Sequence, residues 1–375
     1  MPPTIFSLLD TPAYGGAEEY LCSVLFHLAT KKYHVVLATN NASVKKACIG
    51  KIEVIDLPYR LDAIGNWKGL LKYFLALPGA LFWLRITLQK LRATNAKVVC
   101  LFPGFSDRLS FSPFVKRWGG TLIWLEYGPL EPTFARNHGF PKLLYAFGRP
   151  FPDKIVTISE WTKRSLVQMG KIPESEIEII YPGVEIPFLK PKNQRKKQVI
   201  ISTVARLATE KEIDVLLKAW AKMDRTNKKL QIIGDGPERK YLEELSKDLK
   251  ISDSVKFLGF VSDGKKKRLL SESDLFIFPS AWKLEGFGMT AIEAMAAGIP
   301  VITTGFGPQI EIVENGKTGW YFTAHDDDDL AVVMGKALRS SQRGVMGARG
   351  KKMVQSKFLA SQMCKKWEDL ILTVS

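Results

Sequence analysis

The strongest constraint on the fold is an alternation of short apolar runs, rich in Val and Ile, with longer segments of helical period, repeated in two successive series. Such runs are typical of parallel strands that are buried on both faces of a sheet, and parallel strands need a crossover connection between them, usually a helix. The pattern therefore predicts two doubly wound α/β domains. A length of 375 residues is sufficient for two cores of ordinary size.

The two series predict the domain boundaries. Strands are expected near 5–9, 35–38, 54–57, 98–102, 122–125, 155–158 and 177–180, and then near 199–204, 230–233, 255–257, 275–278 and 300–303. The second series also predicts helices near 214–223, 238–249, 289–297 and 327–338. Residues 187–198 contain two prolines and five basic residues without apolar period, which is typical of a linker. The prediction is thus an N-terminal domain over 1–186, a C-terminal domain over 199–355, and a helical segment over 356–375 that packs back across an interdomain ligand cleft.

The charge balance indicates an anionic partner. The chain has 54 Lys and Arg against 38 Asp and Glu, a net charge of +16, which suits nucleic acid, an anionic membrane or phosphorylated substrates. Nucleic acid is disfavoured because no recognition motif accompanies the charge. Residues 60–97 contain seven basic residues and one Asp among several aromatic residues. This segment fits either peripheral contact with an anionic membrane or a buried helix that is solvated on one side.

Residues 73–84 form the longest apolar run, which is shorter than the ~20 residues of a membrane span. The Pro78-Gly79 pair is expected to interrupt it, so no span is predicted. The N-terminus is expected to be a buried strand rather than a signal peptide. Four widely spaced cysteines indicate neither a disulfide framework nor a zinc site, and they fit a cytoplasmic protein.

No metal site is expected. The acidic run from Asp326 to Asp329 precedes an apolar segment and is typical of a helix N-terminus, where negative charge suits the helix dipole. The histidines have no metal-ligand spacing and are interpreted as structural or surface residues; they are His27, His34, His138 and His325.

The segment from Glu285 to Glu293 reads E-G-F-G-M-T-A-I-E and has the pattern of a sugar-nucleotide site. The Gly286-Phe287-Gly288 turn lets the backbone approach a ligand, and the amides that open the following helix suit a diphosphate. Each carboxylate can accept hydrogen bonds from vicinal hydroxyls. The two acids therefore suggest a ligand with a sugar, a diphosphate and a ribose in line.

Basic and glycine-rich turns follow other predicted strands. Arg206 and Lys211 follow the first strand of the second series, where two cations can clamp a diphosphate, although a solvated basic loop has the same pattern. Gly234-Asp235-Gly236-Pro237 follows the next strand, and Gly15-Gly16-Ala17-Glu18 follows the first strand of the chain. Each of these turns, taken alone, is also an ordinary strand-to-helix connection.

Together, the patterns G-G-A-E, A-R-L-x-x-E-K, G-D-G-P and E-G-F-G-x-x-x-x-E resemble those of family 4 of the retaining glycosyltransferases. The resemblance extends from Gly15 to the closing helix at Phe358. It implies the GT-B fold and transfer of a hexose-type sugar from a UDP- or GDP-sugar to a hydroxyl of a glycan or lipid-linked acceptor. It also implies no metal or other cofactor, with action at the cytoplasmic face of a membrane.

The resemblance implies a role for each matched residue. Arg206 and Lys211 would hold the diphosphate, Glu293 the ribose, and Glu285 the transferred sugar. The remaining binding positions follow: Gly15 and Gly16 border the phosphates and the acceptor, the amides of Phe287, Gly288 and Met289 complete the diphosphate site, and Gly234 and the backbone near Val261 lie beside the base. The acceptor would attack from the leaving-group face, with the departing phosphate helping to take its proton.

The chain departs from the family pattern in two places. Family members commonly have a His at the end of the strand that here reads Leu122 to Tyr127, where Glu126 and Tyr127 are the alternative replacements. The donor sugar therefore stays undecided, with Glu126 included among the catalytic candidates. The second departure is Glu212, because a Gly often follows the lysine.

Other enzyme classes fit less well. A nicotinamide dehydrogenase needs a G-x-G-x-x-G after a strand, which the sequence lacks. A glycoside hydrolase needs two acids on opposite sides of the scissile bond, and two acids on one turn and helix do not provide this. A sugar-nucleotide epimerase and a non-catalytic sugar-nucleotide-binding or membrane-binding protein, both of the GT-B fold, stay open as alternatives.

Overall fold

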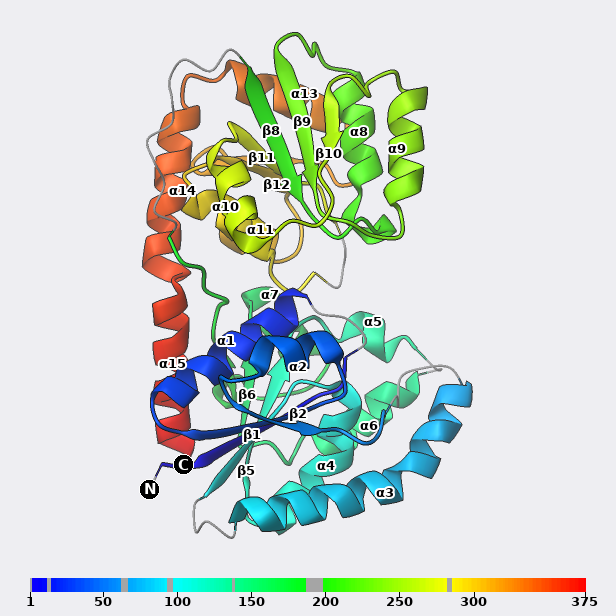
Figure 1. The fold of residues 1–375 in the computed structure, drawn as a ribbon, viewed down its shortest axis with the longest axis vertical. Coiled ribbons are helices and arrows are strands. Elements are labelled where there is room, and N and C mark those ends of the chain that lie inside the picture. Colours follow the sequence, from blue (N-terminus) through cyan, green and yellow to red (C-terminus); the bar gives the residue numbers. More distant parts are fainter. Residues whose placement is uncertain are drawn as a thin grey trace. The chain divides into compact units, whose positions relative to one another are not determined.

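The computed structural model describes residues 2–11, 15–61, 67–92, 97–136, 139–186, 198–281 and 285–375. The chain forms two compact units, the first over Met1–Pro182 with Ser361–Ser375 and the second over Gly183–Ala360. Each unit is an α/β domain with its own sheet (Figure 1). Of the linker predicted over 187–198, residues 187–197 lie outside the described residues.

The first unit contains a seven-stranded sheet with the order β3-β2-β1-β4-β5-β6-β7. All neighbouring strands of this sheet are parallel. The strands are β1 (Thr4–Leu9), β2 (His34–Thr39), β3 (Glu53–Asp56), β4 (Val98–Phe102), β5 (Thr121–Glu126), β6 (Lys154–Thr157) and β7 (Ile177–Ile179). All seven predicted strands are confirmed to within one residue at each end. Buried parallel strands are continuous apolar runs, which makes them easy to find in a sequence.

The helices of the first unit cover both faces of this sheet (Figure 1). They are α1 (Gly16–Thr30), α2 (Ala42–Cys48), α3 (Trp67–Arg92), α4 (Phe105–Arg117), α5 (Glu131–Phe134), α6 (Phe140–Gly148), α7 (Glu160–Gln168) and α15 (Ala360–Val374), with a short 3-10 turn over Glu174–Glu176. Helices α3, α4 and α6 share one apolar core with the strands, through residues such as Leu84, Phe111 and Tyr145.

Helix α3 corrects one expectation. Pro78-Gly79 does not interrupt the segment, because a single helix of 26 residues runs through Pro78. A proline inside a helix costs about 3 kcal/mol, and burial of Tyr73, Ala80 and Leu84 in the core offsets that cost. By length and composition alone, Leu71–Arg92 passes as a membrane span, with a mean hydropathy of 1.3. Core helices of soluble domains pass the same test.

The second unit contains a six-stranded sheet with the order β10-β9-β8-β11-β12-β13, again parallel. Its strands are β8 (Val199–Val204), β9 (Lys228–Ile233), β10 (Val255–Phe257), β11 (Leu275–Phe278), β12 (Val301–Thr304) and β13 (Gly319–Phe322). The five predicted strands are confirmed, and β13 is additional. A Cβ at Gly319 would lie 2.0 Å from the Val301 carbonyl oxygen, so only glycine permits this close start of the edge strand.

The helices of the second unit alternate with its strands along the chain. They are α8 (Ile213–Ala221), α9 (Arg239–Asp248), α10 (Asp263–Ser271), α11 (Met289–Ala296), α12 (Gln309–Ile312), α13 (Asp327–Arg339) and α14 (Arg343–Lys357), with a 3-10 turn over Thr209–Lys211. The acidic run opens α13 as predicted: the Asp326 side chain accepts a hydrogen bond of 2.9 Å from the backbone N–H of Asp329.

The C-terminal helix α15 packs on the first unit, as expected for a helix that crosses back to the N-terminal domain. Trp367 is fully buried, and its indole N–H donates to the Tyr20 hydroxyl at 2.7 Å. The Tyr20 hydroxyl in turn donates to the Ile180 carbonyl oxygen at 3.1 Å. At the surface, Glu368 lies 3.3 Å from the Lys31 ammonium. The end of the chain therefore completes the core of the domain in which the chain starts.

Replacing Trp367 with Ala is expected to lower the free energy of unfolding by about 3–5 kcal/mol, because it leaves a large cavity and removes the donor to Tyr20. Leu372 on the same helix is 62% exposed, so Leu372→Ala should change stability by less than about 0.5 kcal/mol. Urea unfolding followed by circular dichroism measures both. Equal effects of the two substitutions would show that α15 is not part of the core.

Candidate functional site

Two of the predicted donor residues of the second unit, Lys211 and Glu285, meet at the point where its strand order reverses. This switch point lies between β8 and β11, and the edge beyond the carboxyl ends of the strands there is the usual ligand position in a doubly wound sheet. Arg206 and Lys211 follow β8, and Glu285 follows β11. Residues 74 positions apart in the chain thus come into direct contact.

That contact joins the residue predicted to bind the diphosphate, Lys211, to the residue predicted to bind the transferred sugar, Glu285. The Lys211 ammonium donates to Oε2 of Glu285 at 2.6 Å, and the two side chains are only 17% and 13% exposed. A charge-assisted hydrogen bond of this length is strong and directional. A cation suited to phosphate and a carboxylate suited to sugar hydroxyls are therefore held within one hydrogen bond of each other. The pair offers matched contacts to a ligand in which a phosphate is attached to a sugar.

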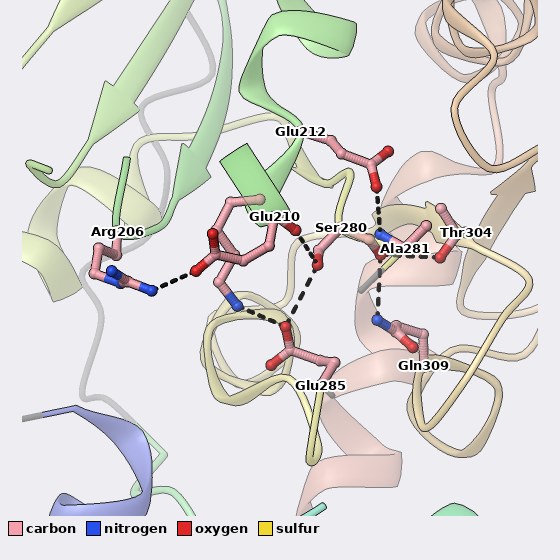
Figure 2. A network of polar contacts seen from close by, with 9 residues as sticks. Arg206, Glu210, Glu212, Ser280, Ala281, Glu285, Thr304 and Gln309 are labelled. Atoms are coloured by element: carbon pink, nitrogen blue, oxygen red, sulfur yellow. Dashed lines mark hydrogen bonds and ion pairs between the residues drawn. The ribbon is translucent and has the colours of Figure 1, made fainter. Parts of the chain in front are cut away.

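Arg206 is more exposed to solvent than Lys211. Its side chain is 61% exposed and is ion-paired with Glu210, four residues further along the chain (Figure 2). Exposed pairs of this kind contribute little to stability, so the guanidinium can exchange Glu210 for a phosphate at small cost. Arg206 is therefore available for an incoming anion.

The loop that carries Glu285 is anchored by Ser280, which sequence reasoning missed. The Ser280 hydroxyl donates to the Glu210 carbonyl oxygen at 3.0 Å and lies 3.5 Å from Oε2 of Glu285. The Ser280 carbonyl oxygen accepts from Oγ1 of Thr304 at 3.1 Å and from Nε2 of Gln309 at 3.3 Å (Figure 2). Ser280, Thr304 and Gln309 are all buried. The position of Ser280 and Thr304 at or just after strand ends was the available signal, because a buried polar side chain there needs a specific partner.

The unusual Glu212 also supports this loop. Glu212 precedes α8 and has a left-handed backbone conformation with a φ of 52°. Glycine adopts this conformation easily, which explains why members of the family often have a glycine here. Its Oε1 accepts from the Ala281 N–H at 3.2 Å, and its Oε2 lies 3.1 Å from Nδ1 of His325. Burial raises the pKa of Glu212, and His325 opposes the shift. The second departure from the family pattern is thus a polar link to the loop.

Glu293 is held by a lysine that the sequence did not point to. Its Oε1 accepts from the Lys266 ammonium of α10 at 2.6 Å, and the two side chains are 20% and 18% exposed. Glu293 lies in α11, whose N-cap Gly288 has a φ of 113° that favours glycine. Glu293 and the amide end of α11 therefore lie on the same helix, as predicted for a ribose and a diphosphate.

The other predicted positions are expected to bind the donor through their backbone, and the structure shows how each is placed. The Phe287 side chain is 2% exposed and packs edge-to-face on Phe358 with ring centroids 5.4 Å apart. A Cβ at Gly234 would lie 1.9 Å from the Ala205 carbonyl oxygen, so this glycine is required for the turn itself. Met289 is the first residue of α11, and Val261 precedes the N-cap of α10.

In the first unit the predicted glycines open α1. Gly15 is the N-cap, and its N–H donates to Oε2 of Glu18 at 2.9 Å, while the Thr11 hydroxyl donates to Oε1 at 2.8 Å. Gly16 is the first residue of the helix. The carboxylate of Glu18 therefore caps this helix and rigidifies the glycine turn.

The two alternatives at the end of β5, Glu126 and Tyr127, have different neighbours in the structure. Oε1 of Glu126 lies 2.5 Å from the Arg108 guanidinium, with side chains 6% and 4% exposed. Burial raises the pKa of Glu126, and Arg108 opposes the shift. Tyr127 lies against α1 instead, with its ring 5.8 Å from that of Tyr20. Glu126 thus pairs with a buried guanidinium, whereas Tyr127 packs on α1. The role of Glu126 at the transferred sugar stays a prediction.

A buried polar cluster occupies the switch point of the first sheet, between β1 and β4. Asp10 accepts from Nδ2 of Asn40 at 2.7 Å and from the Leu61 N–H at 3.2 Å. Asn40 Oδ1, the Tyr59 hydroxyl and Asp107 Oδ1 have no hydrogen-bond partner within the described part of the chain. Burial and Asp10 raise the pKa of Asp107 to about 8, and Arg108 opposes the shift. The cluster can accept hydroxyl groups at this edge of the sheet.

Asp107 makes stability depend on pH. Because its pKa of about 8 exceeds the value of about 3.9 in an unfolded chain, the protonated form favours folding. That stabilisation is complete below about pH 4 and lost as the pH rises through about 8, by up to about 1.4 kcal/mol per unit. Asp107→Asn removes this loss, so urea unfolding from pH 5 to 8 should show the variant gaining stability relative to the wild type. The exposed Asp56→Asn should show no such trend, and parallel curves for Asp107→Asn would refute the prediction.

Comparison with known proteins connects this geometry to a family. The profile described as Glycosyl transferases group 1 matches residues 185–353, and the profile described as Glycosyltransferase Family 4 matches residues 14–187. The two matches together cover both units of the structure.

Individual relatives agree with these profiles. An uncharacterized glycosyltransferase, MJ1607, of Methanocaldococcus jannaschii is 32% identical over 192 residues, which are 48% of this chain and 49% of that protein. A GDP-mannose-dependent alpha-(1-6)-phosphatidylinositol monomannoside mannosyltransferase of Mycobacterium tuberculosis is 27% identical over 237 residues, 58% of this chain and 61% of that protein. The chain thus matches about half of the length of the first relative.

The fold has known counterparts as well. The crystal structure of Anabaena Alr3699/HepE in complex with UDP and glucose superposes with a TM-score of 0.79 at 18% identity, covering 99% of this chain and 100% of that one. At this identity the likeness establishes the fold, which is GT-B.

Proposed function

Because the chain belongs to the glycosyl transferases of group 1 and has the GT-B fold, we propose that it transfers a hexose-type sugar from a UDP- or GDP-sugar to a hydroxyl group. The acceptor is a glycan or a lipid-linked precursor, so the enzyme works at the cytoplasmic face of a membrane. The reaction retains the anomeric configuration and needs no metal ion.

The observation that carries this proposal is the contact between Lys211 and Glu285 at 2.6 Å. Cleavage of the bond between the anomeric carbon and the diphosphate develops negative charge on the leaving oxygen. Lys211, Arg206 and the amide end of α11 stabilise that charge more in the transition state than in the ground state. These cations supply the charge compensation that a divalent ion supplies in other enzymes.

The arrangement of Glu285 supports retention without a protein nucleophile. Its carboxylate is hydrogen-bonded to Lys211 and lies near Ser280, which suits a group that accepts hydrogen bonds from sugar hydroxyls. The acceptor hydroxyl then attacks from the face of the leaving group, and its proton goes to the departing phosphate oxygen. The atoms balance: one C–O bond breaks, another forms, and the nucleoside diphosphate leaves with the proton.

The named relatives support the substrate classes. The Anabaena protein was crystallised with UDP and glucose, and the Mycobacterium tuberculosis enzyme is named for GDP-mannose and a phosphatidylinositol mannoside. Both nucleotides therefore belong in the first screen. A sugar-nucleotide epimerase or a non-catalytic binding protein would bind the same donors, and only transfer or hydrolysis distinguishes the proposed function from these alternatives.

A panel of UDP- and GDP-sugars should identify the donor by thermal shift. A ligand at 100 times its Kd adds about 2.7 kcal/mol of stability, so the cognate donor is expected to raise the Tm by several degrees. Lys211→Met should abolish most of that shift, because it removes a partly buried ammonium from the diphosphate site. Lys317→Met is the matched control, since the Lys317 side chain is 71% exposed. The donor site is refuted if no nucleotide sugar raises the Tm of the wild type.

Glu285→Gln should separate binding from catalysis. The amide keeps the size of the side chain but weakens its hydrogen bonds with sugar hydroxyls, so donor affinity should change little while turnover falls by about 100-fold or more. Slow hydrolysis of the donor measures turnover without a known acceptor. The control is Glu314→Gln, in a loop of the same unit. Unchanged hydrolysis in Glu285→Gln would remove this residue from the mechanism.

A further inference from the structure

Helix α3 has two apolar rows on opposite sides. One row is buried in the domain core and consists of Tyr73, Ala80, Leu84, Leu88 and Leu91. The other row faces solvent, with Leu71 63%, Phe74 52%, Leu75 74% and Phe82 64% exposed. At about 100° per residue the members of each row lie together and the two rows lie about opposite each other. The structure of the domain accounts for the first row and leaves the second row uncovered.

Exposed apolar side chains are concentrated in this part of the first unit. Half of the large hydrophobic residues that are exposed in the described chain lie on α3, α4 and α6. Helix α6 contributes Leu143 and Phe147, which are 68% and 67% exposed and lie four residues apart on one side of the helix. Helix α4 contacts both α3 and α6, and Figure 1 shows the three helices on the same face of the sheet. Clustering of this kind marks an interaction surface rather than scattered exposure.

The charge around these residues selects the partner. Residues 67–92 contain five Lys and Arg and no Asp or Glu. Lys72, Arg85, Lys90 and Arg92 are exposed, and within the described residues none of them is in a salt bridge with an acidic side chain. Basic side chains beside an exposed apolar row complement an anionic lipid surface. A second copy of the same helix would bring like charges together, which disfavours self-association.

The buried row decides how the helix meets a membrane. Although α3 is long enough to span a bilayer, one side of it is the core of the domain, and lipid could surround it only if the sheet were uncovered. A helix with one face in protein and the other exposed lies in the plane of the interface, with its apolar side chains at the boundary of the headgroups.

We propose that the exposed row of α3, together with Leu143 and Phe147 of α6, is a membrane-docking surface that lies on anionic phospholipid. This proposal deepens the proposed function, because a lipid-linked acceptor is presented at such a surface. Lipid binding itself needs neither a donor nor turnover.

Flotation with vesicles tests the proposal. The full-length protein should float with vesicles of phosphatidylcholine mixed with phosphatidylglycerol, and much less with phosphatidylcholine alone. Binding should weaken as salt is added, because the ionic part is screened. The double substitution Leu75→Glu with Phe82→Glu should lower binding at least about tenfold, since it places two acids in the exposed row.

The matched control is Val332→Glu with Val345→Glu. These residues are 67% and 44% exposed on helices α13 and α14 of the second unit, so the control adds the same charge elsewhere and should bind vesicles like the wild type. Thermal unfolding of both variants should match that of the wild type, because all four side chains are exposed.

Four outcomes would overturn the proposal. They are no vesicle binding, equal binding to neutral and anionic vesicles, resistance of the bound protein to alkaline extraction, which indicates a span, and a concentration-dependent dimer that the α3 variant abolishes, which identifies a second copy as the occupant. Donor hydrolysis in solution keeps the two proposals apart. The α3 variant should hydrolyse the donor at the wild-type rate, so a failure of docking leaves the assignment of the donor site intact.

Discussion

The parallel direction of every strand is the constraint on which the rest of the structure depends. Parallel strands require a helix between them, so all loops that lead from a strand to the next helix emerge at one edge of each sheet. In the second unit this edge brings together Lys211 after β8, Glu285 after β11 and Thr304 at the end of β12. Three segments that are distant in sequence thereby supply one polar network, and the order of strands decides which of them are neighbours.

Helices and strands could be predicted from the sequence where the local pattern of apolar and polar residues determines them. Each of twelve strands contains a short run of Val, Ile, Leu or Phe, so their positions could be predicted. Strand β13 was not predicted, because this four-residue edge strand depends on the close approach of Gly319 to Val301, which is a tertiary contact. That α3 continues through Pro78 was not predicted for a similar reason. The local effect of Pro78 favours a break, and only the burial of the row around Leu84 overrides it.

In the candidate site, too, residue types could be predicted from the sequence but tertiary contacts could not. The types and spacing of Arg206, Lys211, Glu285 and Glu293 indicated a sugar nucleotide, because those groups match its charges and hydroxyls. Their partners could not be predicted, since the pair of Lys266 with Glu293 spans 27 positions and depends on the packing of α10 beside α11. The partners of Glu126 and Tyr127 likewise could not be predicted. The contact of Glu126 with Arg108 and that of Tyr127 with Tyr20 depend on how α4 and α1 pack on the sheet.

The basic excess of the chain has its origin outside the donor site. Each cation described there has an acidic neighbour: Arg206 is paired with Glu210, Lys211 with Glu285, and Lys266 with Glu293. The site is therefore close to neutral before a donor arrives, and a diphosphate must replace carboxylates as the partner of these cations. Balanced pairs cannot account for a net charge of +16. Segments such as α3, which contain basic residues and no acid, contribute to the excess, so the charge is available to a surface rather than to the small-molecule substrate.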